Sequence, residues 1–513
     1  MEKQKQKPVY VLLVFVVLLS AFRLAIAAFV SISPDEAYYW TWSRYLDVCY
    51  YDQPGMVAWV DWLFALPFEH STAFTVRIGA VFLSALTTFV LYFLYRDYRQ
   101  REKEAVVFAM VFSILPFSWL AGFMMIHDTA MLPWLVAAYW MIVRIDRYDG
   151  RPLEWFLLAL ALTAAMYAKF SAFMVVWGLV LYMIISKRGR RWWKTWPPYA
   201  AGVLAALLYL PVILWNIEHD WLSLQAVSEL TDQNELTVLD RLNYFLEYVG
   251  SQVGVFSPLL GITVFAALIL GIRNTVRDRN DAETVLPVCL AAPIFLYFLQ
   301  QSFQSHVYGN WPGVAYVPVS MLAMKMVADA WAAGKEKGIF GKRFLKAGLA
   351  VNIMLVVLFS LHLQFDVFGP MLSRLEERFD LRKPIDWRLE QDFRNWGPVM
   401  ELISMEKDED TFIITRRYQV ASMLEFMLPG QPFVECYTSG ERGNQWDLWT
   451  EWKERTGQDA LYVDLKKKIP RALRKSCASI EPVIKGFAPG DPQRPIKEWY
   501  IYRCKNFRGL PPR

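Results

Sequence analysis

Residues 9–30 read VYVLLVFVVLLSAFRLAIAAFV, and a polar turn, Ser33-Pro34-Asp35-Glu36, follows them. An α-helix rises roughly 1.5 Å per residue, so about 20 apolar residues are enough to cross the hydrocarbon core of a bilayer. Residues 9–30 therefore predict a membrane-spanning helix. The apolar stretch contains Arg23 and continues to Val30, unlike the uninterrupted core of a signal peptide, so we expect this helix to be retained.

Similar apolar stretches recur along the chain. The 513 residues are 55% hydrophobic and 16% aromatic, and the mean hydropathy of +0.23 is too high for a soluble protein. Arg23 would be costly in contact with lipid, so we expect it to face an acid or a carbonyl inside the bundle. The apolar pattern predicts about eleven spans, near residues 9–30, 74–95, 105–122, 129–143, 154–168, 170–186, 197–216, 250–272, 284–302, 311–330 and 345–364.

Basic residues occur in every second loop. They precede the first span and then cluster at residues 96–103, 144–151, 187–194, 273–279 and 335–346. By the positive-inside rule these loops and the N-terminus are cytoplasmic, and an odd number of spans places residues 365–513 outside. The same loops explain the net charge of +5, so the charge does not indicate nucleic-acid binding.

Residues 365–513 predict a second domain of α/β type. Apolar runs predict short strands at 411–415, 432–436, 460–464 and 498–503, with helices at 419–428 and 444–456. Strands that alternate with helices favour a parallel or mixed sheet. The five cysteines show no metal-ligand spacing, and an outer compartment permits a Cys477–Cys504 disulfide that the spacing alone does not determine. We therefore expect a polytopic helical membrane domain, 1–364, with a long outer loop at 31–73, and a periplasmic α/β domain, 365–513.

The polar turn after the first span has the pattern of a helix start. Ser33 and Glu36 have capping-box spacing, and Pro34 occupies the first helical position, where its missing N–H is not needed. Asp35 has no such local role, although the aromatic residues after it are typical of a helix in the lipid headgroup layer. Asp35 is therefore either an ordinary solvated carboxylate or a general base held at the membrane surface.

Other outer segments carry polar side chains that also have structural explanations. His127 and Asp128 would cap the following helix, with Asp128 at the N-cap, or would contribute to a metal site. Lys169, alone in an outer turn, would extend to the headgroups or would hold a lipid phosphate. We expect the same outer side to present residues from two further loops, His219, His306 and Asn310.

These segments resemble bacterial membrane glycosyltransferases related to the protein O-mannosyltransferases and to the lipid A aminoarabinose transferase. The similar motifs are, in chain order, Asp35-Glu36-Ala37-Tyr38-Tyr39-Trp40, Tyr50-Tyr51-Asp52-Gln53-Pro54, His127-Asp128, Tyr167-Ala168-Lys169-Phe170, Trp215-Asn216-x-x-His219-x-Trp221 and Asn310-Trp311-Pro312. In the outer domain, the segments 418–421, 429–432 and 443–449 are similar to the lipopolysaccharide-modifying branch. The chain departs from many relatives at Gln53 and Gly55, where they have His and Pro, and before Asn310, where they place a basic residue closer to the Asn.

The resemblance implies a GT-C architecture and inverting transfer of a monosaccharide from a polyprenyl-phosphate donor. The acceptor would be lipid A, lipopolysaccharide core or another glycolipid at the bacterial inner membrane. Asp35 would take the proton of the acceptor hydroxyl as the base. Glu36, Asp52 and Asp128 would support the base or the acceptor. Cations would stabilise the departing phosphate, since it is already an anion, and the candidates are Lys169, Arg44 and Arg77.

The resemblance leaves a divalent metal and the identity of the sugar open. It also leaves an alternative acceptor, because a protein O-glycosyltransferase would use the same donor chemistry. A third alternative is a flippase or transporter of lipid-linked sugars. A transporter is expected to show inverted halves and broken helices near mid-bilayer, whereas the charges of this chain gather in its outer loops.

Overall fold

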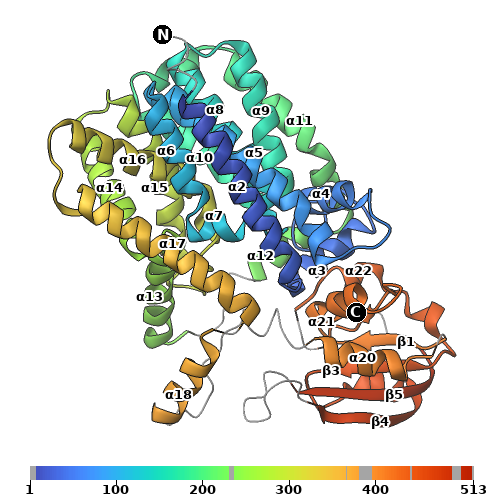
Figure 1. Ribbon diagram of the computed structural model, residues 1–513. Helices are drawn as coiled ribbons and strands as arrows, with labels where there is room; N and C mark the ends of the chain where they lie inside the picture. Colours follow the sequence, from blue (N-terminus) through green and yellow to red (C-terminus); the bar gives the residue numbers. More distant parts are fainter. Residues whose placement is uncertain are drawn as a thin grey trace.

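The computed structural model describes residues 7–229, 236–365, 367–379, 396–408, 410–439, 442–487 and 498–510. A tall helical bundle carries a smaller sheet domain at one end, and the N-terminus lies at the opposite end of the bundle (Figure 1). The sheet domain adjoins α3 (Pro34–Ser43) through its own helices α21 (Tyr418–Met427) and α22 (Trp446–Trp449), so the loop after the first helix lies where the two parts meet (Figure 1).

The α-helices of the bundle follow the apolar stretches. They are α2 (Lys7–Phe29), α3 (Pro34–Ser43), α4 (Met56–Ala65), α5 (Ala73–Arg99), α6 (Glu102–Ser113), α7 (Pro116–Leu120), α8 (His127–Arg147), α9 (Pro152–Ala168), α10 (Met174–Ile185), α11 (Pro197–Glu218), α12 (Leu222–Glu229), α13 (Val238–Val255), α14 (Pro258–Arg277), α15 (Ala282–Gln301), α16 (Tyr316–Ala332), α17 (Lys342–Phe365) and α18 (Gly369–Phe379). Short 3-10 segments adjoin them at η1 (Phe170–Phe173), η2 (Gly189–Lys194), η3 (Trp311–Ala315) and η4 (Gly338–Phe340).

Seven helical segments within the described residues are long and apolar enough to cross a membrane. They comprise α2, α5, α11, α14, α15, α16 with η3, and α17. Three shorter apolar helices accompany them, at Met56–Ala65, Pro152–Ala168 and Phe170–Ile185. A multi-pass helical membrane protein is thus confirmed, and the number of eleven spans stays a prediction.

Two predicted spans are wrong as continuous helices. The stretch 105–122 divides into α6 and α7 at Ile114-Leu115, and the stretch 250–272 divides into α13 and α14 at Phe256-Ser257. A proline starts the second helix in each case, at Pro116 and Pro258. Proline has no N–H to donate and disfavours helical geometry in the residue before it, so the helix ends there.

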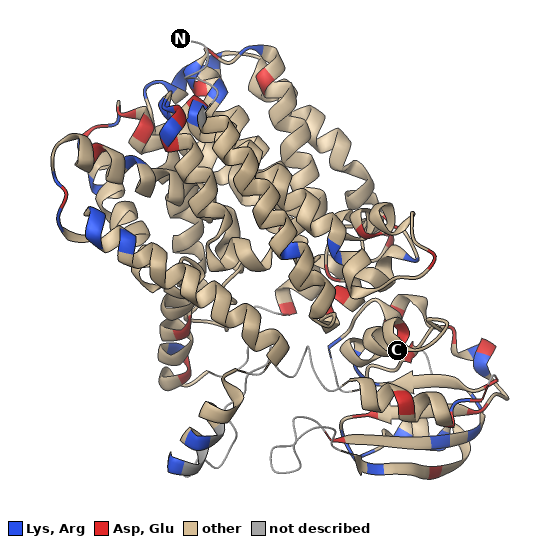
Figure 2. Ribbon diagram, viewed as in Figure 1, with Lys and Arg blue, Asp and Glu red and all other residues tan. Residues whose placement is uncertain are grey.

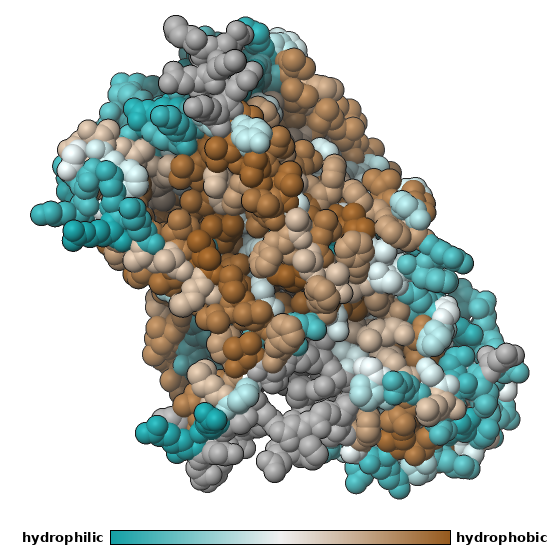
Figure 3. All heavy atoms as spheres, viewed as in Figure 1, coloured by the Kyte–Doolittle hydropathy of each residue, from teal (hydrophilic) through white to brown (hydrophobic). Residues whose placement is uncertain are grey.

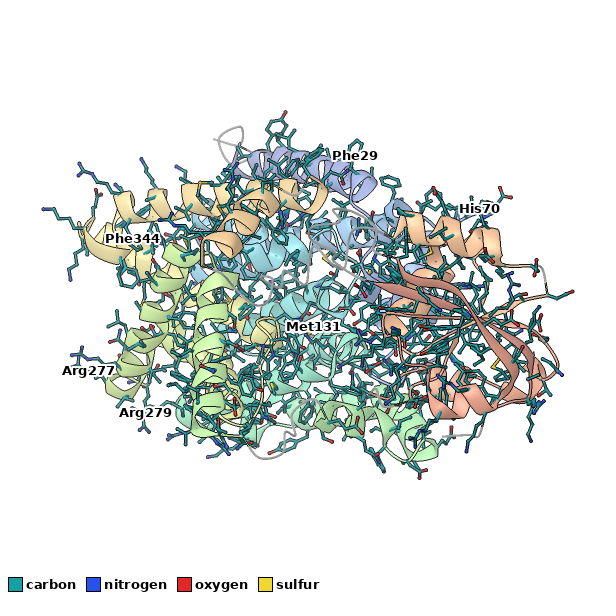
Figure 4. The ribbon with its side chains drawn as sticks, turned by 90° about the horizontal axis from the view of Figure 1, so that it is seen from below. Phe29, His70, Met131, Arg277, Arg279 and Phe344 are labelled. Atoms are coloured by element: carbon teal, nitrogen blue, oxygen red, sulfur yellow. A yellow bond between two sulfur atoms is a disulfide. The ribbon has the colours of Figure 1, made fainter. Side chains whose placement is uncertain are left out.

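The surface of the bundle matches a lipid environment. Large apolar side chains are exposed along its helices, and a broad hydrophobic surface covers them (Figure 3). Lys and Arg gather instead at the end of the bundle where the N-terminus lies (Figure 2). At one edge of the bundle, Arg277 and Arg279 point away from the helices, whereas Met131 lies near its centre and is fully buried (Figure 4). Buried Arg23 donates to the carbonyls of Ser113 at 2.7 Å and Ser118 at 3.0 Å, so the prediction for this arginine is confirmed.

The second domain contains a mixed five-stranded sheet of order β2-β1-β3-β5-β4, in which β2, β1 and β3 are parallel and β5 is antiparallel to both its neighbours. This confirms the predicted α/β class. The division of the chain after residue 364 stays a prediction, and α17 ends at Phe365. The elements are α20 (Gly397–Glu406), β1 (Phe412–Thr415), α21 (Tyr418–Met427), β2 (Glu435–Cys436), α22 (Trp446–Trp449), η5 (Trp452–Arg455), β3 (Ala460–Asp464), α23 (Arg471–Lys475), β4 (Cys477–Phe487) and β5 (Trp499–Phe507).

Three details of this domain differ from the sequence prediction. The helix expected at 444–456 consists of α22 and η5, and β2 comprises only Glu435 and Cys436, the two residues that pair with β1. Strand β4 was not predicted, because it is an edge strand with mostly exposed side chains and little apolar alternation. A disulfide joins Cys477 at the start of β4 to Cys504 in β5.

Candidate active site

The short helix α3 presents Asp35 at the end of the bundle that faces the sheet domain. Ser33 is its N-cap and forms the predicted capping box with Glu36, while Pro34 opens the first turn. The capping box and the proline are thus confirmed. Glu36 is fully buried, whereas Asp35, one position before it, is exposed.

Glu36 and Arg77 form a buried ion pair that holds α3 against α5. Arg77 donates to both carboxylate oxygens, from Nε at 2.8 Å and from Nη2 at 2.7 Å. Its remaining N–H groups donate to the carbonyls of Ala27, Val30 and Ser31. All five donors of the guanidinium therefore have partners. The geometry therefore gives Arg77 a structural role at the base of α3. This role differs from the phosphate contact that was predicted for it.

A second cluster joins three outer turns. The Lys169 ammonium lies 2.9 and 3.0 Å from the two carboxylate oxygens of Asp128, and the Asn310 side-chain amide donates to the same carboxylate at 2.7 Å. Lys169 is largely buried, with 12% of its side chain exposed. Two of its three N–H groups contact Asp128, and within the described residues the third has no partner. One N–H therefore remains for a ligand.

Tyr39 is close to both Asp35 and the cluster of Asp128, Lys169 and Asn310. Asp35 and Tyr39 are four residues apart and so share a face of α3. The Tyr39 ring packs edge-on against His127 at 4.3 Å between centroids. Burial and the carboxylates of Asp35, Asp52 and Asp128 raise the pKa of Tyr39 well above its ordinary value, so its hydroxyl stays protonated.

His127 is part of the packing at the start of α8. The N-cap of this helix is Ile126, so the predicted capping by Asp128 is wrong. The extended backbone at Ile126 starts the helix two residues earlier than an N-cap at Asp128 would. His127 Nδ1 instead lies 3.0 Å from the Ala168 carbonyl oxygen, next to Lys169.

Asp52 is the second carboxylate of the first outer loop. The Tyr38 hydroxyl donates to it at 2.7 Å, and the Arg442 guanidinium of the second domain lies 2.8 Å from its other oxygen. Burial raises the pKa of Asp52, an effect that Arg442 and Tyr38 partly oppose. The neighbouring Gln53 side chain accepts a hydrogen bond from the Phe170 N–H at 3.2 Å, which ties this loop to the Lys169 turn.

The second domain docks directly on α3. The Tyr38 ring packs on Tyr418 at 4.5 Å and stacks on Trp446 at 5.6 Å between centroids. The Gln445 N–H donates to the Tyr38 hydroxyl at 3.0 Å. The sequence analysis did not assign these residues to the site, although the outer-domain motifs at 418–421 and 443–449 were the signal that could have indicated them.

The other predicted site residues lie apart from Asp128 and Lys169. Arg44 pairs with Glu425 of the second domain at 2.6 Å, so it serves the contact between the domains. His219 stacks on Trp215 at 4.0 Å, and His306 lies 3.3 Å from Glu247 on α13. Among the residues that the structure describes, no three His, Cys, Asp or Glu side chains are placed to hold a metal ion.

An apolar cavity of about 660 Å³ opens between α9, α10 and α11. It extends from Trp155 and Trp193 to Phe170, which directly follows Lys169. Its lining is almost entirely apolar, as a hydrocarbon chain requires. The cluster of Asp128, Lys169 and Asn310 thus lies beside one end of a cavity that is suited to a lipid tail.

The helical fold and the apolar membrane-spanning helices are those of polytopic GT-C proteins. The whole chain superimposes on the aminoarabinose transferase ArnT from Cupriavidus metallidurans in its apo state, with a TM-score of 0.62, 14% identity, and coverage of 95% of this chain and 97% of that one. The same transferase bound to undecaprenyl phosphate gives a TM-score of 0.59, 14% identity, and coverage of 97% and 98%. These similarities establish the fold.

The sequence comparisons give the family relationship. Residues 52–215 match the family described as dolichyl-phosphate-mannose-protein mannosyltransferase. The lipid A galacturonosyltransferase RgtD of Rhizobium johnstonii is 24% identical over 327 residues, 64% of this chain and 65% of that protein. The undecaprenyl phosphate-alpha-4-amino-4-deoxy-L-arabinose arabinosyl transferase of Erwinia tasmaniensis is 30% identical over 181 residues, 34% of this chain and 32% of that protein. The chain thus spans less than two thirds of the length of either relative, and the resemblance to this superfamily is confirmed.

Proposed function

We propose that the protein transfers a monosaccharide from a polyprenyl-phosphate donor to lipid A or another lipopolysaccharide component at the outer face of the bacterial inner membrane. One observation carries this proposal. A lysine ammonium, held by Asp128 and Asn310, lies beside an apolar cavity, and Asp35 is exposed on the short helix whose Tyr39 packs on His127, next to Asp128. This arrangement offers a cation to a lipid phosphate and a base to an acceptor.

The mechanism follows from these positions. Asp35 takes the proton of the acceptor hydroxyl while that oxygen attacks the anomeric carbon, and the bond from this carbon to the phosphate oxygen breaks with inversion. The phosphate leaves as an anion, and the remaining Lys169 N–H stabilises the charge that grows on it. Asp128 and Asn310 hold the ammonium in place. The polyprenyl tail occupies the cavity between α9, α10 and α11.

The relatives support this choice of donor and acceptor. RgtD is named for lipid A and galacturonic acid, and ArnT has been solved with undecaprenyl phosphate. The similarity to RgtD covers 64% of this chain, whereas the match to the protein mannosyltransferase family covers residues 52–215 only. A lipid acceptor is therefore favoured over a polypeptide.

Reconstitution of the purified protein tests the proposal. We expect lipid A to gain one sugar residue by mass spectrometry in the presence of a polyprenyl-phosphate donor that carries galacturonic acid, aminoarabinose or a neutral hexose. The Asp35→Asn variant is the matched control and should leave lipid A unmodified. Transfer to a periplasmic protein extract with lipid A unchanged would identify a protein O-glycosyltransferase instead. Absence of transfer from every donor would contradict the proposal.

The orientation is also a proposal, in which the N-terminus is cytoplasmic and residues 365–513 are periplasmic. The basic end of the bundle in Figure 2 supports it through the positive-inside rule. Alkaline phosphatase fused after residue 400 should be active, and the same enzyme fused after residue 190 should be inactive. The reverse result would place Asp35 on the cytoplasmic side and contradict the scheme.

A further inference from the structure

Arg442 of the second domain reaches into the outer loop that carries Asp52. Its Nη2 donates to the Ala226 carbonyl of α12 at 3.0 Å, and the same nitrogen lies 2.8 Å from Asp52 Oδ1. One side chain therefore joins three segments that are far apart in the sequence: the first outer loop, α12 and the C-terminal domain. Asp52 keeps 16% of its side chain exposed and Arg442 keeps 29%, so the pair is partly shielded from water.

A hydrogen-bond chain continues from this pair to the helix that carries Asp35. The other Asp52 oxygen accepts from the Tyr38 hydroxyl, and Tyr38 accepts in turn from the Gln445 N–H. Gln445 also accepts from the Tyr51 N–H through its side chain at 2.7 Å. Residues 442–445 thus hold Asp52 on one side while the Tyr38 ring is packed by Tyr418 and Trp446. The second domain therefore contacts both Asp52 and its partner Tyr38 on α3.

We propose that Arg442 is a positioning residue that orients Asp52 in the active site, so that docking of the C-terminal domain completes the site. The inference rests on the proposed function, because it assigns Asp52 to the support of that reaction. The ion pair is more than a tether between the domains, since Arg44 and Glu425 already link α3 to α21 at 2.6 Å without touching Asp52.

The charges around Asp52 make the role measurable. Arg442 and the Tyr38 hydroxyl favour the carboxylate, while burial and the Glu229 carboxylate of α12 disfavour it. The hydroxyls of Tyr39 and Tyr418 also lie within electrostatic reach. Replacement of Arg442 by a neutral residue removes the largest opposing effect, so the pKa of Asp52 must rise and a smaller fraction is ionised at a given pH.

The experiment measures kcat/KM against pH for lipid A modification, with the polyprenyl-phosphate sugar that the wild type accepts. Arg442→Gln should lower kcat/KM about tenfold. It should also shift the acid limb of the pH profile to higher pH by about one unit. Arg442→Lys should have an acid limb close to that of the wild type, because the positive charge remains. Arg44→Gln, which breaks the other ion pair between the domains, should leave the limb in place.

A double-mutant cycle shows whether Arg442 acts through Asp52. In an Asp52→Asn background, Arg442→Gln should lower kcat/KM less than twofold. Arg44→Gln should lower kcat/KM as much as it does in the wild type. An unmoved acid limb together with additive losses would overturn the role of Arg442. If Asp35→Asn retained full activity, the proposed function itself would fail, and that result does not depend on any Arg442 variant. Thermal melting of Arg442→Lys shows whether a loss reflects unfolding.

Discussion

Arg77 donates two hydrogen bonds to the carboxylate of Glu36, and both side chains are completely buried, whereas Asp35 next to Glu36 is exposed. Two adjacent carboxylates of one helical turn therefore have different physical roles. Glu36 anchors α3 to α5, and Asp35 is exposed at the surface.

The buried pair should be essential for stability. Arg77→Ala leaves the Glu36 charge buried without its partner, which costs about 3–5 kcal/mol. We expect a large fall in the melting temperature of the purified protein in detergent. Arg101→Ala breaks the partly exposed pair with Glu104, worth about 0–1 kcal/mol, and is the control. Equal melting temperatures for the two variants would contradict the structural role of Arg77.

Asp35→Asn should abolish transfer without affecting the fold. The amide keeps the shape of the side chain but cannot accept the proton, and loss of a general base lowers rates by about 10²–10⁴. Because Asp35 is exposed, the melting temperature should stay at the wild-type value. Glu36→Gln should show the opposite pattern, with a clear loss of stability, since it leaves the Arg77 charge uncompensated. Full transfer by purified Asp35→Asn would refute the assignment of the base.

Lys169→Ala should weaken the interaction with the donor phosphate. The measurement is the KM for the donor together with the binding of undecaprenyl phosphate, and we expect a higher KM or a lower kcat. Lys169→Arg should keep part of the activity, because its charge remains with a different geometry. Lys325→Ala is the matched control, since Lys325 is equally buried and pairs with Asp329 at 2.9 Å in a different part of the bundle. Wild-type kinetics of Lys169→Ala at limiting donor would favour a lysine that only extends to the headgroups.

Contact between the domains should depend on pH through Glu425. Burial raises the pKa of Glu425 to about 8, and this effect outweighs the attraction of Arg44. The folded state then holds a proton that the unfolded chain releases near pH 4.5. Stability from this group is therefore full at acidic pH and is lost as the pH rises through about 8. Glu425→Gln should flatten the decline of the melting temperature between pH 5 and pH 9, and an unchanged decline would refute the shift.

The sequence by itself determined the class of fold and indicated most residues of the candidate site. Apolar length predicts the helices, because a helix in lipid must satisfy its own backbone hydrogen bonds. The cap residues Ser33 and Glu36 predict the start of α3, since capping depends on residues only three positions apart. Local rules also indicated Asp35, Asp128, Lys169 and Asn310 as candidates, and the structure brings the last three into one cluster.

Only the tertiary structure decided which partner each charged side chain takes. Arg77 and Arg44 look equivalent to Lys169 in the sequence, yet Arg77 pairs with Glu36 and Arg44 with Glu425. Arg442 could not be linked to Asp52 from the sequence, because 390 positions separate them (442 − 52) and no local pattern records such a contact. Ion pairs of this kind depend on how distant segments pack, since the energy of a charge is set by its surroundings in space rather than by its neighbours in the chain.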